Sequence, residues 1–219
     1  MTTKNHSCNT SNAKLTKRQM GSQVTLLKKE MHSAIGLYIK KVGWKRTSSW
    51  IFRQEGIWYL TAFVFPVVHV SETGTASFSV HSWFGIKPMM VDPIYWDIAG
   101  FPANKAKPLS FRSNAAVQAP PYPIQERSYI HLGEVSLDFA ARKIVDNVLS
   151  QADVARKTVD VPSFADQVAR HPENQSFMML YCTSLIAEDR KKLAKDTLKD
   201  HYGKESRHYG EFCIRIDAM

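Results

Sequence analysis

Residues 44–86 read WKRTSSWIFRQEGIWYLTAFVFPVVHVSETGTASFSVHSWFGI, and this stretch decides the fold. Its middle, residues 57–70, is rich in β-branched and aromatic side chains, which fit the pleated surface of a strand. A Glu55-Gly56 break precedes it, and residues 71–75 form a typical hairpin link in which Gly74 can adopt a positive φ. The stretch therefore predicts three consecutive antiparallel strands, at residues 44–53, 57–70 and 76–86.

The second and third predicted strands differ in how their faces alternate. Residues 57–70 are apolar on both faces, as in a central strand covered on both sides. Pro66 lacks an amide proton, so we expect pairing to fail or a bulge to form there. The third strand is apolar on one face only. Its other face is half polar and indicates a groove, an edge or a partner surface: Ser77, Ser79, His81 and Trp83.

Length and composition point to a packed protein without a membrane span. The chain has 219 residues and is 44% hydrophobic, which suffices for one large domain or two small ones. Its three cysteines are widely spaced, form no metal pattern and suit a reducing compartment. The N-terminus lacks the apolar region of a signal peptide, and no stretch approaches the roughly 20 apolar residues of a membrane helix. We therefore expect a cytoplasmic protein without cofactors.

The positive charge is concentrated in the first quarter of the chain. Residues 1–53 hold eleven Lys or Arg residues and one acidic residue, Glu30, a net charge of +10. Residues 54–219 hold 18 basic and 19 acidic residues, a net charge of −1. Such asymmetry is consistent with an acidic partner, including nucleic acid, but we favour the simpler interpretation of a soluble basic tail plus a solvated helix face.

The rest of the chain is predicted to cover the strands. Residues 1–20 are expected to be a disordered basic tail, and residues 21–219 a single α+β domain. A helix with a regular apolar stripe is expected at residues 22–42, to lie on the sheet. Seven of the ten prolines fall in residues 87–127, which we expect to be ordered loops. Residues 134–203 are expected to be mainly helical.

Shorter elements are expected within these regions. The loop region is expected to hold a helical turn at 94–99 and strands at 110–113 and 127–133. Helices are expected at residues 136–157, 163–169 and 174–201, and residues 211–216 read as a small strand or a frayed tail. The predicted fold class is α+β: an antiparallel sheet of three to five strands covered by an N-terminal helix and C-terminal helices.

A family resemblance covers the beginning of this pattern. Gly43-Trp44-Lys45-Arg46, then Ser49-Trp50-Ile51-Phe52-Arg53, then an apolar strand, then Ser77-Phe78-Ser79-Val80 and Gly85-Ile86 follow one another. This order over residues 24–90 resembles the bacterial domain of unknown function 4304 family. The chain departs from it at residues 66–70, where that family has a Gln-Lys/x-Ser motif. The resemblance implies a bacterial α+β domain and makes a binding role thinkable, but it carries no catalytic residues.

Two sets of polar residues were weighed as chemical sites. His69 and His81 share a face, but a turn at 71–75 places His81 opposite Phe65 and His69 about 13 Å away, at about 3.3 Å per residue. That separation is too large for a shared metal ion with bonds near 2 Å. Asp92 and Asp97 offer paired carboxylates for acid–base work. We favour the simpler interpretation that Asp92 caps a helical turn that begins at Pro93.

No motif for a phosphate loop, a zinc protease or a nucleophile elbow is present. Cys182 lies among apolar residues and is expected to be a buried, inert thiol. Aromatic and basic residues alternate around Trp44 and Trp50, whose rings are expected to be core anchors. The candidate binding surface is Lys28, Lys29, Lys45, Arg46, Arg53, His81 and Trp83.

Three functions follow in order of preference. The first is a non-enzymatic binding or accessory domain with a protein partner. The second is a nucleic-acid-binding protein that uses the basic segment at residues 4–53, with affinity that falls steeply as salt rises. The third is an enzyme with a site in the loops at 87–127, which a deep polar pocket there would favour. The sequence does not indicate an oligomeric state.

Overall fold

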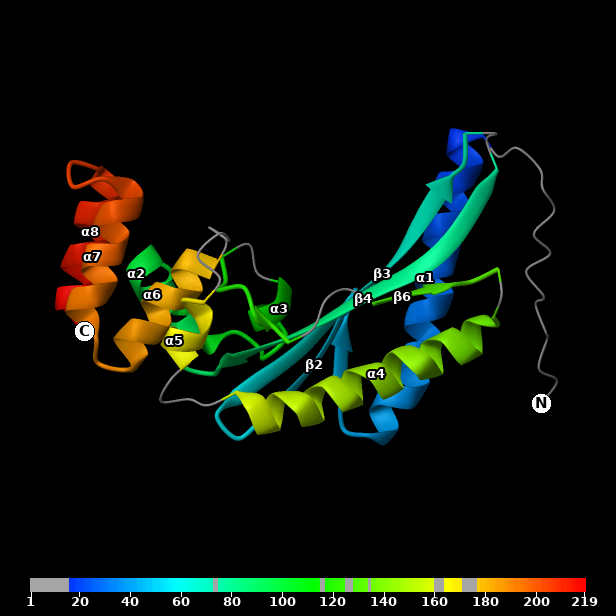
Figure 1. The fold of residues 1–219 in the computed structure, drawn as a ribbon, viewed down its shortest axis with the longest axis horizontal. Helices are drawn as coiled ribbons and strands as arrows, with labels where there is room; N and C mark the ends of the chain where they lie inside the picture. Colours follow the sequence, from blue (N-terminus) through cyan, green and yellow to red (C-terminus); the bar gives the residue numbers. More distant parts are fainter. Residues whose placement is uncertain are drawn as a thin grey trace. The chain divides into compact units, whose positions relative to one another are not determined.

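The computed structural model describes residues 16–72, 75–114, 117–124, 128–133, 135–159, 164–170 and 177–219 (Figure 1). The elements of the first half are α1 (Lys17–Lys41), β1 (Lys45–Thr47), β2 (Trp50–Glu55), β3 (Trp58–Val70), β4 (Ala76–Pro88), α2 (Val91–Ala99) and the 3-10 helix η1 (Pro102–Ala106). Those of the second half are α3 (Phe111–Asn114), β5 (Tyr122–Pro123), β6 (Ser128–His131), α4 (Leu137–Thr158), α5 (Phe164–Val168), α6 (Met178–Ala187), α7 (Lys191–Tyr202) and α8 (Arg207–Asp217).

The strands form one sheet, which confirms the predicted α+β class with an antiparallel sheet. Five strands follow the order β1-β2-β3-β4-β5, and β6 also pairs with β4. The register of β6 places Tyr129 opposite His81 and His131 opposite Ser79. Farther along β4, Gly85 pairs with Pro123 of β5. The strand predicted at 127–133 is therefore present, and it brings a third row of side chains beside β4.

Two details of the predicted strands differ from the structure. The strand expected at 44–53 is broken after β1, where Ser48 has a φ of 48° and the chain turns into β2. A small polar residue tolerates this left-handed conformation better than a β-branched one. Strand β3 runs without interruption through Pro66, where a break or bulge was expected.

The chain divides into two compact units. The first comprises Met1–Ile51, Ala62–Phe84 and Gln125–Ala152, and the second comprises Phe52–Thr61, Gly85–Ile124 and Asp153–Met219. The boundaries therefore fall inside strands β2, β3 and β4 and inside helix α4.

Helix α1 begins five residues earlier than predicted because Thr16 caps it. The Thr16 hydroxyl accepts a hydrogen bond from the Gln19 amide, and the Gln19 side chain accepts one from the Thr16 amide. This capping box satisfies two amide protons that a helix end otherwise leaves unpaired. Its apolar stripe buries Met31, Ile35 and Ile39 in the first unit. Residues 1–15, most of the predicted tail, lie outside the described residues.

The second unit is built mainly from helices. Helix α6 packs against α2, α5 and α7, and α8 packs against α2 and α7. Their shared core includes Ile98, Leu185, Leu198 and Ile216, each with none of its surface exposed. The apolar first half and charged second half of the predicted helix 174–201 correspond to the buried α6 and the more exposed α7.

Three predictions for the second half of the chain were wrong. Residues 110–113 were expected to be a strand, but Phe111–Asn114 is the short helix α3. The helix expected at 174–201 is broken at Asp189, whose φ of 60° ends α6 before α7 begins. Residues 211–216 belong to helix α8, because Phe212 and Ile216 pack into the helical core, whereas a lone strand there would lack a partner.

Candidate functional site

Alternation along β3 and β4 divides the sheet of the first unit into a covered face and an open face. Five even-numbered residues are buried, with at most 3% of their surface exposed: Ala62, Val64, Val80, Ser82 and Phe84. Toward the turn between the two strands this contrast fades, because Pro66, Val68 and Phe78 are half-buried. Most odd-numbered residues are half-buried or exposed: Phe63, Phe65, Val67, His69, His81 and Trp83. Successive side chains of a strand point to opposite faces, so the odd-numbered set forms the open face.

Both helices described in the first unit lie on the covered face. Asn147 of α4 donates a hydrogen bond to the Ser128 hydroxyl, which is 2.8 Å from the hydroxyl of the buried Ser82. Tyr38 of α1 donates to the Asp138 carboxylate of α4, so the two helices adjoin (Figure 1). The odd-numbered residues are therefore left without a helix of this unit above them.

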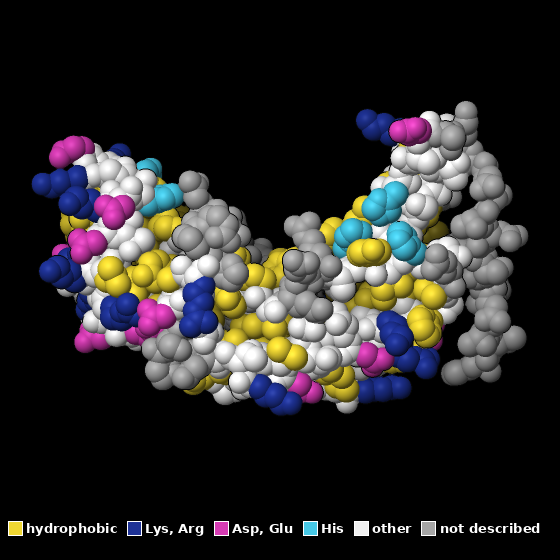
Figure 2. Space-filling model, in the orientation of Figure 1, with side chains coloured by type: hydrophobic (Ala, Val, Ile, Leu, Met, Phe, Trp, Pro, Cys, Tyr) yellow, Lys and Arg dark blue, Asp and Glu magenta, His cyan; other side chains and the backbone are white. Residues whose placement is uncertain are grey.

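Aromatic and imidazole rings form a continuous network on the open face. We call it the aromatic face: Trp50, Phe63, Phe65, His69, His81, Trp83, Tyr129 and His131. Neighbouring ring centroids are 4.6 Å apart for Trp50–Phe63, 4.9 Å for Phe63–Phe65, 5.6 Å for Phe65–His81, 6.0 Å for His81–Tyr129 and 5.3 Å for Tyr129–His131. Trp83 adjoins Trp50 at 5.6 Å. Figure 2 shows histidine side chains gathered on the surface over β3, β4 and β6.

The buried Ser79 hydroxyl orients the imidazole rings of His69 and His81. The Ser79 side chain is fully buried although it belongs to the open face, and its hydroxyl is 2.8 Å from His69 Nε2 and 2.9 Å from His81 Nε2. A hydroxyl can donate to one ring nitrogen and accept from the other, so a single serine can orient both rings.

The estimate that His69 and His81 are about 13 Å apart was wrong for their rings. The ring centroids are 5.9 Å apart, and His131 lies 6.4 Å from His69. The offset along the strands ignored the reach of the side chains, which lean toward each other over Ser79. Within the part of the chain that the structure describes, no three His, Cys, Asp or Glu side chains are arranged to hold a metal ion.

None of the described strand residues on the open face carries a carboxylate. The strand segments of the first unit include no Asp or Glu residue. At the edge strand β1, Arg46 donates to the Ser48 carbonyl, and its guanidinium lies beside Gly36 of α1. Because neighbouring residues of a strand alternate, Lys45 points to the side away from α1, which is the side of the aromatic face. Both basic side chains are exposed.

The structure gathers only part of the predicted binding surface. His81 and Trp83 belong to the aromatic face, and Lys45 lies at the edge strand. Lys28 and Lys29 are exposed on α1, which lies on the covered face. Arg53 belongs to the second unit, where its Nε is 3.1 Å from the Glu55 carboxylate.

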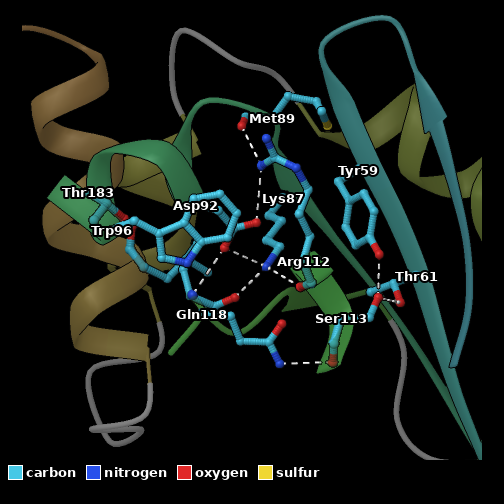
Figure 3. A network of polar contacts seen from close by, with 12 residues as sticks. Tyr59, Thr61, Lys87, Met89, Asp92, Trp96, Arg112, Ser113, Gln118 and Thr183 are labelled. Atoms are coloured by element: carbon cyan, nitrogen blue, oxygen red, sulfur yellow. Dashed lines mark hydrogen bonds and ion pairs between the residues drawn. The ribbon is translucent and has the colours of Figure 1, made fainter. Parts of the chain in front are cut away.

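The carboxylate of Asp92 lies inside the second unit, and its predicted role as a helix cap was wrong. Helix α2 begins at Val91, so Asp92 is within its first turn. Its Oδ1 accepts from Lys87 Nζ at 2.8 Å and from the Ala119 amide at 3.2 Å, and its Oδ2 accepts from Arg112 at 3.2 Å. Both Lys87 and Asp92 are completely buried (Figure 3).

Every proton of the Lys87 ammonium group has an acceptor. Besides Asp92, it donates to the carbonyls of Arg112 at 2.9 Å and Ala119 at 2.6 Å. Burial lowers the pKa of Lys87, and the nearby Asp92 carboxylate opposes that effect. Next to this pair, the Tyr59 and Thr61 hydroxyls both bond to Ser113, and burial raises the pKa of Tyr59. The three protons of the Lys87 ammonium group are thus bonded within the fold, and both members of the Lys87–Asp92 pair are enclosed. Beside them, the Gln118 side chain donates to the Ser113 carbonyl at 2.9 Å, while its buried Oε1 has no hydrogen-bond partner among the described residues.

The two other candidate groups of the second unit have simple structural roles. Asp97 forms an ion pair with Lys105 on the surface, apart from the bonds of Asp92. Cys182 is fully buried in α6, and burial raises the pKa of its thiol to about 12. A thiol with that pKa holds its proton at neutral pH and is a poor nucleophile.

The two tryptophans of the first unit that were expected to be core anchors differ in burial. Trp44 is buried as expected, whereas Trp50 belongs to the aromatic face.

Sequence reasoning missed Tyr129 and His131 because the signal was divided between distant segments. Within residues 63–69 and 79–83, the alternation of side-chain types along each strand is enough to predict which side chains share the open face. Tyr129 and His131 alternate in the same way, but only the pairing of β6 with β4 places them beside His81 and Ser79. No local pattern specifies that pairing across nearly 50 residues of intervening chain.

Comparison with protein-family models, with curated proteins and with solved structures finds no match for this chain. The resemblance to the domain of unknown function 4304 family therefore stays an expectation that rests on the residues between 24 and 90. Among the described residues, none of the helices has the length and apolar character needed to cross a bilayer.

Proposed function

We propose that this chain is a non-enzymatic binding module whose recognition surface is the aromatic face. The observation that carries the proposal is a connected row of eight rings left on one side of the sheet while both helices of the unit cover the other. Large exposed apolar patches are unfavourable in water and commonly mark interaction sites. Trp and Tyr are also the residues that most often dominate binding energies at interfaces.

The proposal includes the cytoplasm as the place of action and a macromolecule as the partner. The buried, protonated Cys182 thiol is compatible with a reducing compartment. An open sheet face suits a macromolecule better than a small metabolite, which typically requires a concave site.

An enzyme with its site in the loops at 87–127 has less support. Lys87, Asp92 and Arg112 are the strongest polar cluster of that region, and their hydrogen bonds are made within the fold. A general acid or base must reach a substrate proton directly or through one water molecule. Lys87 and Asp92 have no exposed side-chain surface and therefore do not meet that condition.

The test is capture from the protein's own cells with matched variants. Tagged wild-type protein, Tyr129→Ala and Phe139→Ala are crosslinked in cells and purified. Tyr129 is 62% exposed on the aromatic face, and Phe139 is 45% exposed on helix α4, which covers the opposite face. Each variant removes one exposed ring from the same unit, so their folding costs should be similar.

We expect wild type and Phe139→Ala to capture the same macromolecule and Tyr129→Ala to lose it. Equal capture by all three proteins would place recognition elsewhere on the chain and overturn the proposal. A nuclease treatment before purification separates a protein partner, which survives it, from a nucleic acid, which does not.

A further inference from the structure

We propose that the occupant of the aromatic face is a single-stranded nucleic acid, with its bases stacked on the exposed rings and its phosphates near Lys45 and the histidines. This inference rests on the proposed function, because it names the partner of the same surface. It differs from binding through the basic N-terminal segment, since the contacts come from strands β1, β3, β4 and β6.

The chemistry of the rings suits stacking. Tyr129 is 62% exposed and lies between His81 and His131, with centroids at 6.0 and 5.3 Å. Unstacked bases have planar π-faces that stack on Tyr, Trp, Phe and His side chains. Single-strand-binding proteins with aromatic side chains on a sheet surface hold bases in this way. Ser79 fixes two of the imidazoles from below, so their orientation is prepared before a ligand arrives.

The charges of the face favour a polyanion. Among the strand segments of the first unit, Lys45 lies on the side of this face, Arg46 lies toward α1, and no residue is Asp or Glu. In the sequence the first 53 residues carry a net charge of +10, but most of the described basic residues among them belong to α1, on the covered face. Phosphate groups are attracted by such a surface, whereas a protein partner of average composition brings both signs of charge and needs carboxylates opposite its own basic groups.

The shape of the face favours a single strand over a duplex. In a duplex the bases are stacked inside and present only their edges in the grooves. Reading those edges takes an element that enters a groove, such as a helix or a two-stranded ribbon. The two helices described in the first unit, α1 and the first part of α4, lie on the opposite face. Strands β3 and β4 are flanked in the sheet by β2 and β6, so the part of them that carries the rings is not a free two-stranded ribbon.

The experiment measures fluorescence anisotropy of labelled oligonucleotides of about 12 nucleotides, within the site sizes known for single-strand binders. Mixed-sequence RNA, DNA of the same sequence and the corresponding DNA duplex are titrated with the full chain. The proteins are wild type, Tyr129→Ala, Phe139→Ala and the double charge reversal Lys28→Glu/Lys29→Glu on α1. Titrations are repeated at two salt concentrations.

We expect single strands to bind more tightly than the duplex and to bind more weakly as salt rises. Tyr129→Ala should weaken single-strand binding about tenfold, a typical cost of losing one stacking ring, while Phe139→Ala leaves it unchanged. The RNA and DNA titrations show which kind of strand the face prefers.

Three outcomes would overturn the inference, and one of them leaves the proposed function standing. Equal or tighter binding of the duplex excludes recognition by stacking. Loss of binding in Lys28→Glu/Lys29→Glu with unchanged binding in Tyr129→Ala assigns the nucleic acid to α1. Absence of oligonucleotide binding, together with a nuclease-resistant partner that Tyr129→Ala loses from cells, makes the occupant a protein and retains the binding module.

Discussion

Burying Lys87 removes an ammonium group from water, and the Asp92 carboxylate offsets that cost within the second unit. The pair is completely buried, with Nζ and Oδ1 2.8 Å apart. Replacement of one partner in such a pair leaves an uncompensated charge in a low-dielectric interior. The contribution of Asp92 to stability therefore depends on the presence of the Lys87 ammonium group, and that of Lys87 depends on Asp92.

We predict that Asp92→Asn lowers the free energy of unfolding by about 3–5 kcal/mol, because it leaves the Lys87 ammonium unpaired. Urea denaturation measures the change. The control is Lys105→Ala, which removes the surface ion pair with Asp97 and should cost less than about 1 kcal/mol. Similar losses in the two variants would show that Lys87 and Asp92 do not depend on each other.

Glu55 is a second charged residue whose contribution to stability depends on an ion-pair partner, here at a partly exposed site. The Arg156 guanidinium donates to its carboxylate at 2.6 and 2.8 Å, and these hydrogen bonds lower the pKa of Glu55. A carboxyl group whose pKa is lower in the folded state stabilises the protein above its unfolded pKa. That contribution is lost as the pH falls through the lowered folded pKa.

We predict that Glu55→Gln is less stable than wild type by about 1 kcal/mol at pH 7, a modest value because Arg156 is partly exposed. The difference should begin to shrink as the pH falls below the ordinary carboxyl pKa and should vanish once the pH has passed the lowered folded pKa, where protonation breaks the ion pair in the wild type. Urea unfolding at a series of pH values measures it. Glu205→Gln, at an exposed position, should show little difference at any pH; a constant difference for Glu55→Gln would exclude the linkage.

At the scale of elements, the sequence predicted the parts whose pattern is local. The strands from β2 to β4 and the helices α1 and α4 follow from alternation and helical spacing. The helix predicted at 174–201 failed because a single left-handed residue, Asp189, interrupts an otherwise helical pattern. The strand predicted at 211–216 failed because alternating Phe212, Ile214 and Ile216 fit a strand locally, while packing against the other helices decides the structure.

The contrast between local sequence pattern and long-range packing also explains which residues of the candidate site were predicted. His81 and Trp83 were found because β4 alternates between apolar and half-polar residues. Lys28, Lys29 and Arg53 were grouped with them by charge alone, and the fold separates them. Tyr129 and His131 join the face through the pairing of β6 with β4, which is a long-range property.

The end of α2 gives a prediction at the scale of elements. Gly100 follows the helix with a φ of 84°, and Arg215 of α8 donates to the Ile98 carbonyl at 2.8 Å. A Cβ at position 100 would lie 3.2 Å from the Arg215 guanidinium. We predict that Gly100→Ala lowers the free energy of unfolding by about 1–2 kcal/mol, from backbone strain and from displacement of Arg215.

The matched control is Gly210→Ala, in the interior of α8. A Cβ there would meet no atom within 4 Å, so it should stabilise the protein by about 0.5–1 kcal/mol through helix propensity. Thermal unfolding of the two variants should therefore shift in opposite directions. A shift in the same direction would mean that neither the φ of Gly100 nor Arg215 controls this helix end.

At the scale of the whole molecule, the two compact units share secondary structure. Domain boundaries usually fall in exposed linkers. Here the divisions after Ile51, Thr61, Phe84 and Ala152 fall inside β2, β3, β4 and α4. A strand cannot lose its pairing in one half without disturbing the hydrogen-bonded ladder of the other half. We therefore expect the units to unfold together.

The prediction is tested with one probe in each unit. Cys182 is fully buried in the second unit, so its reaction with a thiol reagent in urea, with Cys8 and Cys213 replaced by Ser, reports the opening of that unit. Tryptophan fluorescence after Trp58→Phe and Trp96→Phe reports the first unit, which retains Trp44, Trp50 and Trp83. Coincident midpoints are expected for a cooperative transition. Labelling of Cys182 at urea concentrations where the fluorescence is still native would show that the shared strands do not couple the units.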